Sequence, residues 1–320
     1  MKSLILGIGG QDGFFLGRSL VQQGFSVIGV LLPEDMGNET IPHLPQNGLS
    51  LVQASICDHD VLRDIIRLEQ PTYLYNFAGI SFIPYSWDAP RDVEKINGYA
   101  VGEILHIIKE ESPSTRFFQA CSSEMFGHHP KESPQNEETR FNPDNPYGSS
   151  KVFAYYLVKN YREHYGIFAC SGILYNHESE WRPPRFVSRK ITMAAAAIKL
   201  GRQDAVNLGS LDSLRDWSYA GDIVEAMQLM MNADEPGDYV LSSGKLHAVR
   251  DILDIAFGHV GLDWSEYTRI DESLTRPPES KPLCGDPTKA RTQLGWQPKV
   301  SFEDMIRLMV DMDLHRLKNG

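Results

Sequence analysis

Residues 4–13 read LILGIGGQDG, a short apolar run that passes directly into a cluster of glycines. Such glycines let the backbone turn sharply and approach a pyrophosphate, whose charge is favoured by the N-terminus of the helix that follows. The position of the motif, after a first strand and before a first helix, predicts a dinucleotide-binding site. The residues assigned to it are Gly7, Gly10, Gln11, Asp12 and Gly13.

Short apolar runs alternate with stretches of helical periodicity through the first half of the chain. The runs are short and continuous, as in strands buried on both faces, and helical patterns separate them. This alternation predicts an α/β fold with a Rossmann-type doubly wound parallel sheet. The expected strands are 4–8, 26–32, 49–53, 73–77, 116–121 and 169–174, and the expected helices are 14–23, 58–69, 92–111 and 147–165.

The rhythm changes after Tyr175, where a polar stretch rich in arginine and proline begins. We divide the chain into a dinucleotide-binding domain, residues 1–174, completed by a strand near 238–242, and a smaller, mixed, discontinuous substrate lobe, residues 175–320. Ser301 and Asp304 are expected to cap the last helix. The expected elements are helices 186–200, 220–231, 249–260, 287–294 and 301–317, a strand at 205–208 and a turn at 215–217.

Charge and composition exclude several classes of function. The net charge of −11 argues against nonspecific nucleic-acid binding, because a surface that follows phosphates is basic. The first apolar run is too short for a signal peptide, and no run reaches the length of a membrane span. Four scattered cysteines without metal-like spacing predict reduced thiols, no metal site and a cytoplasmic location. They are Cys57, Cys121, Cys170 and Cys284.

Tyr147 and Lys151 are spaced by four residues on a predicted helix, and Ser122 and Glu124 lie about two dozen residues upstream. The spacing places the tyrosine and the lysine on one helix face. A tyrosine is a poor base at its usual pKa of about 10, so a nearby cation is needed to favour the phenolate. Alone, this pattern is also typical of ordinary surface and core positions, and Ser122 to Glu124 could simply end a strand and cap a helix.

The residues at the end of the second strand indicate whether NAD or NADP is the cofactor. An acid there binds the ribose 2′-hydroxyl of NAD, whereas an arginine accommodates the 2′-phosphate of NADP. Residues 30–35 read VLLPED, and their acids would repel a 2′-phosphate, which slightly favours NAD. Two later strand ends could flank the adenine or the ribose, although both could also be plain loops. These are Ser55 and Ile56, and Phe77, Ala78 and Ser81.

Taken together, the glycine motif, the Tyr147/Lys151 pair and the Ser-Ser-Glu signature resemble extended short-chain dehydrogenases/reductases. Within that group, several stretches are similar to the GDP-mannose 4,6-dehydratase family, and the resemblance extends over residues 4–311. The stretches are GIGGQDG, QACSSEMFG, NPYGSSK, GILYNHESEWRPPRFVSRKI, LRDW, SSGKLHAVRDI, RPPESKPLCGD and LGWQPKVSFEDM.

The resemblance implies a redox-neutral elimination from a GDP-sugar with a nicotinamide cofactor. Tyr147 would take the proton of the sugar 4-hydroxyl, and Ser122 would hydrogen-bond the 4-oxygen. Glu124 would abstract the C5 proton and then protonate the departing 6-hydroxyl, one carboxylate acting as base and then acid. Lys151 would also hold the nicotinamide ribose. His177 and Arg182 match cofactor contacts of the family, and its contacts to the GDP-sugar are matched by Asn176, Val187, Lys190, Arg215, Arg276 and Glu279.

Departures from the family pattern qualify these expectations. Leu31 and Leu32 replace an arginine pair for the 2′-phosphate, so the family favours NADP whereas this departure favours NAD. Segment 33–48 is shorter than the loop that builds the tetramer in the family. The resemblance therefore implies a homo-oligomer that is either a dimer or a tetramer. Its subunits would pair through helices 92–111 and 147–165. Ile80 and Phe82 stand where the family has polar residues, a change that could favour another GDP-sugar such as a heptose.

Three further alternatives remain open at this point. The same fold could serve a GDP-4-keto-6-deoxy-sugar reductase or an epimerase, and a catalytically idle dinucleotide-binding protein would belong to another class. Trp181 and Trp217 could stack on a base or simply pack in the core.

Overall fold

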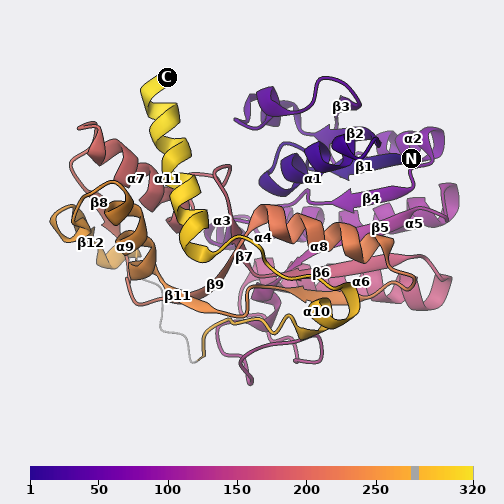
Figure 1. Cartoon of the computed structure of the whole chain (residues 1–320). Coiled ribbons are helices and arrows are strands. Elements are labelled where there is room, and N and C mark those ends of the chain that lie inside the picture. Colours follow the sequence, from indigo (N-terminus) through magenta and orange to yellow (C-terminus); the bar gives the residue numbers. More distant parts are fainter. Residues whose placement is uncertain (275–280, 320) are drawn as a thin grey trace.

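A seven-stranded sheet, in which every neighbouring pair is parallel, forms the larger part of the molecule (Figure 1). The structure, a computed structural model, describes residues 1–274 and 281–319. The strand order β10-β6-β5-β4-β1-β2-β3 confirms the predicted doubly wound fold. The strands are β1 Lys2–Leu6, β2 Ser26–Leu31, β3 Leu49–Gln53, β4 Tyr73–Asn76, β5 Arg116–Ser122, β6 Ala169–Leu174 and β10 Asp238–Leu241.

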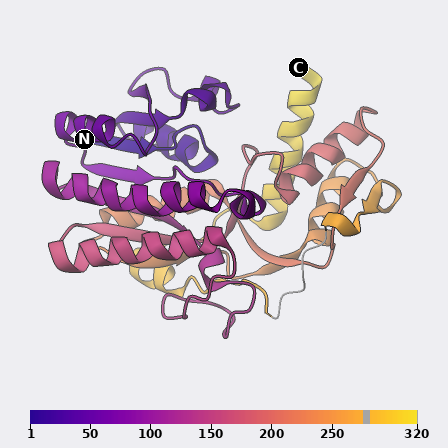
Figure 2. The same ribbon diagram turned by 180° about the vertical axis from the view of Figure 1, so that it is seen from behind.

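Helices cover both faces of this sheet (Figures 1 and 2). Successive strand residues point to opposite faces, so Ile5 packs in one core and Leu4 in the other. Helices α1, Gln11–Gln22, and α8, Ala220–Asn232, cover the first face. Helices α2, His59–Glu69, α5, Ala100–Glu111, and α6, Pro146–Tyr165, cover the second. No helix within the described ranges is both long and apolar enough to cross a membrane.

The strand order reverses between β1 and β4, which brings two loops together at the carboxyl edge of the sheet. Gly7 has a φ of +85°, and a Cβ built there would lie 2.8 Å from the backbone nitrogen of Ala78. A Cβ on Gly13 would lie 2.4 Å from the Gly7 carbonyl oxygen. Side chains at these two positions would therefore prevent the close approach of β1, α1 and β4.

A second group of elements forms a smaller lobe beside the carboxyl edge (Figure 1). It contains helices α7, Val187–Lys199, α9, Val249–His259, and α11, Phe302–Asn319, with strands β8, Val206–Leu208, and β12, Thr268–Ile270. The three helices share one apolar core. A three-stranded sheet of β7, Asn176–Glu178, β9, Leu214–Tyr219, and β11, Leu246–Ala248, lies between this lobe and the large sheet.

One expectation about local structure is wrong and another holds with a local change, and polar side chains are involved in both. The expected helix 92–111 is interrupted between α4, Pro90–Glu94, and α5 by one π-helical turn, Lys95–Tyr99. Within that turn the Asn97 amide pairs with the backbone N–H and C=O of Ile80, each at 2.9 Å. The expected turn at 215–217 belongs to β9, where buried Asp216 accepts backbone N–H groups of Ser243 and Gly244.

Short elements complete the chain. The Ser301 hydroxyl accepts the Asp304 N–H at 3.1 Å at the start of α11, which confirms the expected cap. Residues 33–48 contain only two 3₁₀ turns, Pro33–Gly37 and Ile41–His43. The others are α3 Ile83–Asp88, α10 Thr288–Leu294 and the 3₁₀ turns Ser123–Phe126, Trp264–Glu266 and Glu272–Leu274.

Candidate active site

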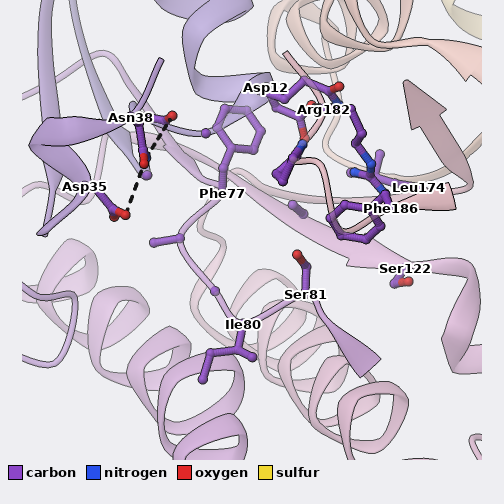
Figure 3. A pocket seen from close by; sticks show the side chains of 18 of the residues that line it. Asp12, Asp35, Asn38, Phe77, Ile80, Ser81, Ser122, Leu174, Arg182 and Phe186 are labelled. Atoms are coloured by element: carbon purple, nitrogen blue, oxygen red, sulfur yellow. Dashed lines mark hydrogen bonds between the residues drawn. The ribbon is translucent and has the colours of Figure 1, made fainter. Parts of the chain in front are cut away.

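A cavity of about 720 Å³ lies at the carboxyl edge of the sheet, between the glycine loop and the segment before α7 (Figure 3). This edge is where ligands bind in doubly wound folds. Most of the predicted site residues line it together, from both halves of the sequence. They are Gly7, Gly10, Gln11, Asp12, Ser55, Ile56, Phe77, Ala78, Ser81, Ser122, Glu124, Tyr147, Lys151, Asn176, His177 and Arg182.

The glycine loop presents the N-terminus of α1 to this cavity. Gly10 occupies the N-cap position, and no side chain within the described residues caps the helix there. The Gly9 carbonyl accepts the Thr40 hydroxyl at 2.7 Å, so segment 33–43 rests on the loop. The N-terminus of this 12-residue helix has uncapped N–H groups and lies beside glycines at which a Cβ would clash. This combination fits the pyrophosphate of a dinucleotide.

A buried ion pair ties α1 to β7 beside the loop. The Asp12 carboxylate lies 3.0 Å from Nε2 of His177. Burial opposes both charges, but each partner favours the charge of the other, so the pKa of Asp12 is lowered and the pKa of His177 is raised. Gln11 donates to the His177 carbonyl at 3.1 Å and accepts the Ser179 hydroxyl at 2.6 Å. Four polar side chains thus fix the glycine helix to the second half of the chain.

The reactive side chains come from two neighbouring elements. Strand β5 ends at Ser122, and the 3₁₀ turn that follows carries Glu124. Tyr147 and Lys151 lie on the first turns of α6, and both side chains are buried. The Lys151 ammonium donates to the Ala120 carbonyl at 2.9 Å and lies 5.8 Å from the centroid of the Tyr147 ring.

The pKa of Tyr147 is subject to two opposing influences. Burial raises its pKa to about 12, while a hydrogen bond with the Ser122 hydroxyl acts in the opposite direction. Burial also lowers the pKa of Lys151. The arrangement of Lys151 against the Ala120 carbonyl therefore does not by itself lower the pKa of the tyrosine, and a lower value requires a further positive charge in the cavity.

Glu124 has one partner that the sequence did not reveal. The Asn145 amide donates to its carboxylate at 3.0 Å, and the same side chain caps α6 by accepting the Gly148 N–H at 2.8 Å. The N-cap position before Pro146 predicts the capping contact. The contact to Glu124 depends on how α6 packs against the end of β5, and no local pattern reports that packing.

The opposite end of the cavity is lined by Leu31, Leu32 and Asp35 (Figure 3). Asn38 donates to the Asp35 carboxylate at 3.4 Å and to the Gly9 carbonyl at 3.3 Å. The sequence contains no lysine or arginine between Arg18 and Arg63. The end of β2 and the 3₁₀ turn that follows it therefore present apolar and acidic groups to this end of the cavity.

Several predicted residues lie elsewhere. Gly13 underlies the glycine loop, and Val187, Lys190 and Arg215 are not among the residues that line the cavity. Arg276 and Glu279 fall outside the described residues. Trp217 is buried and stacks on Phe302 at 5.8 Å, which favours its packing role.

Aromatic, apolar and arginine side chains complete the lining, and of these Arg185 and Phe186 were not predicted from the sequence. Arg185 and Phe186 line the cavity, and Phe82 meets the Phe186 ring at 6.3 Å. Ile80 also lines it, whereas Trp181 both lines it and packs on Phe14 at 4.9 Å. Aromatic and apolar side chains thus form part of the cavity wall, and Trp181 belongs to the side formed by α1.

Comparison with known proteins identifies the family of this chain. The GDP-mannose 4,6 dehydratase family model matches residues 4–309. A protein of Arabidopsis thaliana named GDP-mannose 4,6 dehydratase 2 is 40% identical over 328 residues, which cover 99% of this chain and 87% of the relative.

Solved structures agree on the fold. UDP-glucose 4-epimerase of Thermotoga maritima superimposes with a TM-score of 0.87 at 22% identity, covering all of both chains. A dTDP-glucose 4,6-dehydratase of Bacillus anthracis, in complex with NAD, has a TM-score of 0.85 at 19% identity and covers 100% of this chain and 97% of that one. The cavity, its glycine loop and the match along almost the whole sequence lead to one conclusion: this chain belongs to the GDP-mannose 4,6-dehydratase family.

Proposed function

We propose that this protein is a GDP-mannose 4,6-dehydratase, which converts GDP-mannose to the GDP-4-keto-6-deoxy sugar with loss of water. The observation that carries the proposal is the position of Glu124, which lines the same cavity as Tyr147 and Lys151. A tyrosine and a lysine suffice to exchange a hydroxyl for a ketone, but an elimination needs a further base for the C5 proton. Membership of the family supports the same reaction.

Tyr147 is assigned as the base that removes the proton of the sugar 4-hydroxyl, and Ser122 as the hydrogen-bond partner of the 4-oxygen. The hydrogen bond between these two side chains, which both line the cavity, supports this assignment. The chemistry supplied by a bound oxidised nicotinamide is a positive charge beside the phenol and a site that accepts hydride from C4 and returns it to C6. Lys151, fixed on the Ala120 carbonyl at 2.9 Å, keeps donors available for the nicotinamide ribose.

Glu124 is assigned as the base and then the acid of the elimination. Once C4 is a ketone, the C5 proton becomes acidic, and the carboxylate removes it. The same carboxyl group then protonates the 6-hydroxyl, which leaves as water, while the C5–C6 double bond forms. Addition of hydride at C6 and of a proton at C5, balanced by the proton that Tyr147 took from the 4-hydroxyl, would complete a product that differs from the substrate by one water molecule and has no net change in redox state.

The remaining assignments follow the family resemblance and the lining of the cavity. Residues 1–174 with β10 form the cofactor domain, and the rest of 175–320 forms the substrate lobe. The cofactor is held by the glycine loop and by residues of the later strand ends and β7. The GDP-sugar is assigned to Asn176, Val187, Lys190, Arg215, Arg276 and Glu279, of which Asn176 lines the cavity.

We favour NAD over NADP as the cofactor. The ribose end of the cavity is lined by Leu31, Leu32 and Asp35, and a 2′-phosphate would meet the carboxylate of Asp35 without a compensating arginine from this strand. Titration of the protein with NAD⁺ and NADP⁺, followed by quenching of tryptophan fluorescence, tests this choice without any sugar. NAD⁺ should bind at least about tenfold more tightly, and Leu32→Arg should reduce the difference, because a charged hydrogen bond contributes about 1.5–3 kcal/mol. Equal or tighter binding of NADP⁺ would refute it.

We assign the protein as a dimer and place it in the cytoplasm. The outer face of the second helix layer carries exposed aromatic side chains that support the dimer. Tyr99, Phe153 and Tyr156 are 65%, 43% and 49% exposed, and Tyr99 meets Phe153 at 5.5 Å on neighbouring turns of the π-helical segment and α6. Large exposed apolar groups of this kind mark association surfaces. The four cysteines are free thiols, three of them buried, as expected in a reducing compartment. Sedimentation of wild type and Phe153→Glu tests the dimer.

Incubation with GDP-mannose and a catalytic amount of NAD⁺ tests the proposed function. The expected product is the GDP-4-keto-6-deoxy sugar, with no net absorbance change from the cofactor. Glu124→Gln should lower the rate by about 10³-fold or more while NAD⁺ still binds. Inertness toward GDP-mannose and related GDP-hexoses and heptoses would refute the assignment. Stoichiometric consumption of reduced cofactor with a 4-keto-6-deoxy sugar would instead indicate a reductase.

A further inference from the structure

Asn145 joins the two elements that carry the reactive groups. Its carbonyl oxygen, Oδ1, accepts the N–H of Gly148 at 2.8 Å and caps α6. Its amide nitrogen, Nδ2, donates to Oε2 of Glu124 at 3.0 Å. Asn145 is only 5% exposed.

The orientation of this amide is fixed by chemistry. A backbone N–H can only donate, so the Asn145 atom facing Gly148 has to be the oxygen. The nitrogen consequently faces Glu124, and its second hydrogen faces Oδ1 of Asp144 at 3.2 Å. Serine, threonine and aspartate also cap helices, but among the preferred capping side chains only asparagine adds an amide donor to the capping acceptor.

The surroundings leave Glu124 dependent on this contact. Within the described part of the chain, the one hydrogen bond to its carboxylate comes from Asn145. The close packing of α6 on the 3₁₀ turn supports the contact, since a Cβ on Gly148 would lie 2.5 Å from the Glu124 carbonyl oxygen. Asp144 is itself fixed by the backbone N–H of His128 at 2.8 Å.

We propose that Asn145 is a positioning residue for the elimination step, holding Oε2 of Glu124 so that Oε1 faces the sugar as the base. The inference rests on the proposed role of Glu124 and adds a residue that acts only through it. The hydrogen bond occupies Oε2, so Oε1 is the oxygen left to remove the C5 proton. The same bond restricts the rotation of the carboxylate, so a larger fraction of its conformations has the reactive geometry.

Asn145→Ser separates positioning from capping. Serine preserves an N-cap acceptor but removes the donor to Glu124, so the protein should fold and melt as wild type does. The expected result is a kcat for GDP-mannose that is about five- to tenfold lower, as for the loss of one hydrogen bond to a charged group. Asn142→Ser, the same exchange at an exposed position three residues away, is the matched control and should leave kcat unchanged.

Isotope effects identify the step that Asn145 supports. With GDP-[5-²H]mannose the effect on kcat should increase in Asn145→Ser, because proton removal at C5 becomes slower relative to the other steps. With GDP-[4-²H]mannose the effect should not increase, since Tyr147 is untouched. Asn145→Asp, which also preserves the cap but places a carboxylate against Glu124, should lose more activity and show the same selective effect at C5.

Two outcomes would overturn the inference while wild type still forms the product. One is an Asn145→Ser protein with the kcat and both isotope effects of wild type. The other is a protein with a lower melting temperature and a lower kcat but unchanged isotope effects, which would reduce Asn145 to a helix cap. Failure of wild type to eliminate water from any GDP-sugar would refute the proposed function and, with it, this role of Glu124.

Discussion

The two ends of the cavity differ in how their polar groups are partnered. At the glycine end, Asp12, His177, Gln11 and Ser179 bond to one another, and each is held by a partner from the other half of the chain. At the reactive end, Glu124 and Lys151 each make one described side-chain hydrogen bond, which leaves further donor and acceptor positions free for a ligand. The first end is held in shape by its own contacts, whereas the second leaves polar groups available for the proposed proton transfers.

The largest expected effect is at the reactive end. Tyr147→Phe removes only the phenolic oxygen, so the shape of the cavity remains but the group that takes the 4-hydroxyl proton is lost. The rate of product formation should fall by about 10³-fold, within the range of general acid–base catalysis. NAD⁺ titration should give the wild-type affinity. Tyr156→Phe, on the exposed side of the same helix, should match wild type in both measurements. A Tyr147→Phe protein with substantial activity would contradict the assignment.

A smaller effect, on stability as well as binding, is expected at the glycine end. Asp12→Asn breaks the buried pair with His177, which should cost about 3 kcal/mol in the free energy of unfolding and weaken NAD⁺ binding. Asp60→Asn removes an acid from the first turn of another helix, α2, but at an exposed position; it controls for the helix dipole and should cost much less. Chemical denaturation measures both.

The pH dependence of that stability has a defined sign. Because the pKa of Asp12 is lowered from 3.8, its contribution is present above pH 3.8 and is lost as the pH falls through the lowered pKa. Because the pKa of His177 is raised from 6.5, its contribution is present below pH 6.5 and is lost as the pH rises through the raised pKa. The difference between wild type and Asp12→Asn should therefore be greatest between pH 3.8 and 6.5 and decrease on both sides. A difference that does not vary with pH would contradict the ion pair.

The smallest expected effect concerns one neutral hydroxyl, that of Ser179, which also accepts the Trp181 N–H at 3.1 Å. Ser179→Ala removes the hydroxyl that donates to Gln11 at 2.6 Å. The loss of one buried neutral hydrogen bond costs about 1 kcal/mol, so NAD⁺ should bind about fivefold more weakly while kcat at saturating cofactor stays unchanged. A larger effect on kcat than on binding would mean that the glycine end also takes part in the chemistry.

This contrast also explains what the sequence could reveal. Gly13 is required by contacts within one βαβ unit and Gly7 by its positive φ, and Tyr147 and Lys151 are neighbours through helical spacing, so local patterns predicted them. The pair of Asp12 with His177 joins residues 165 positions apart, and the contact of Asn145 with Glu124 depends on the seating of α6. Neither leaves a periodic or compositional trace. Asp216 was predicted in a turn because it is polar, whereas donors from distant loops satisfy it inside β9.

The transfer of deuterium within the sugar tests the central claim most directly. GDP-[4-²H]mannose is incubated with the protein and NAD⁺, and the product is analysed by NMR and mass spectrometry. An internally redox-neutral dehydration predicts that the deuterium leaves C4 and is recovered at C6 of the 4-keto-6-deoxy product, without net reduction of the added cofactor. Recovery of the label in the pool of free reduced cofactor, or a product that retains its 6-hydroxyl, would contradict the account.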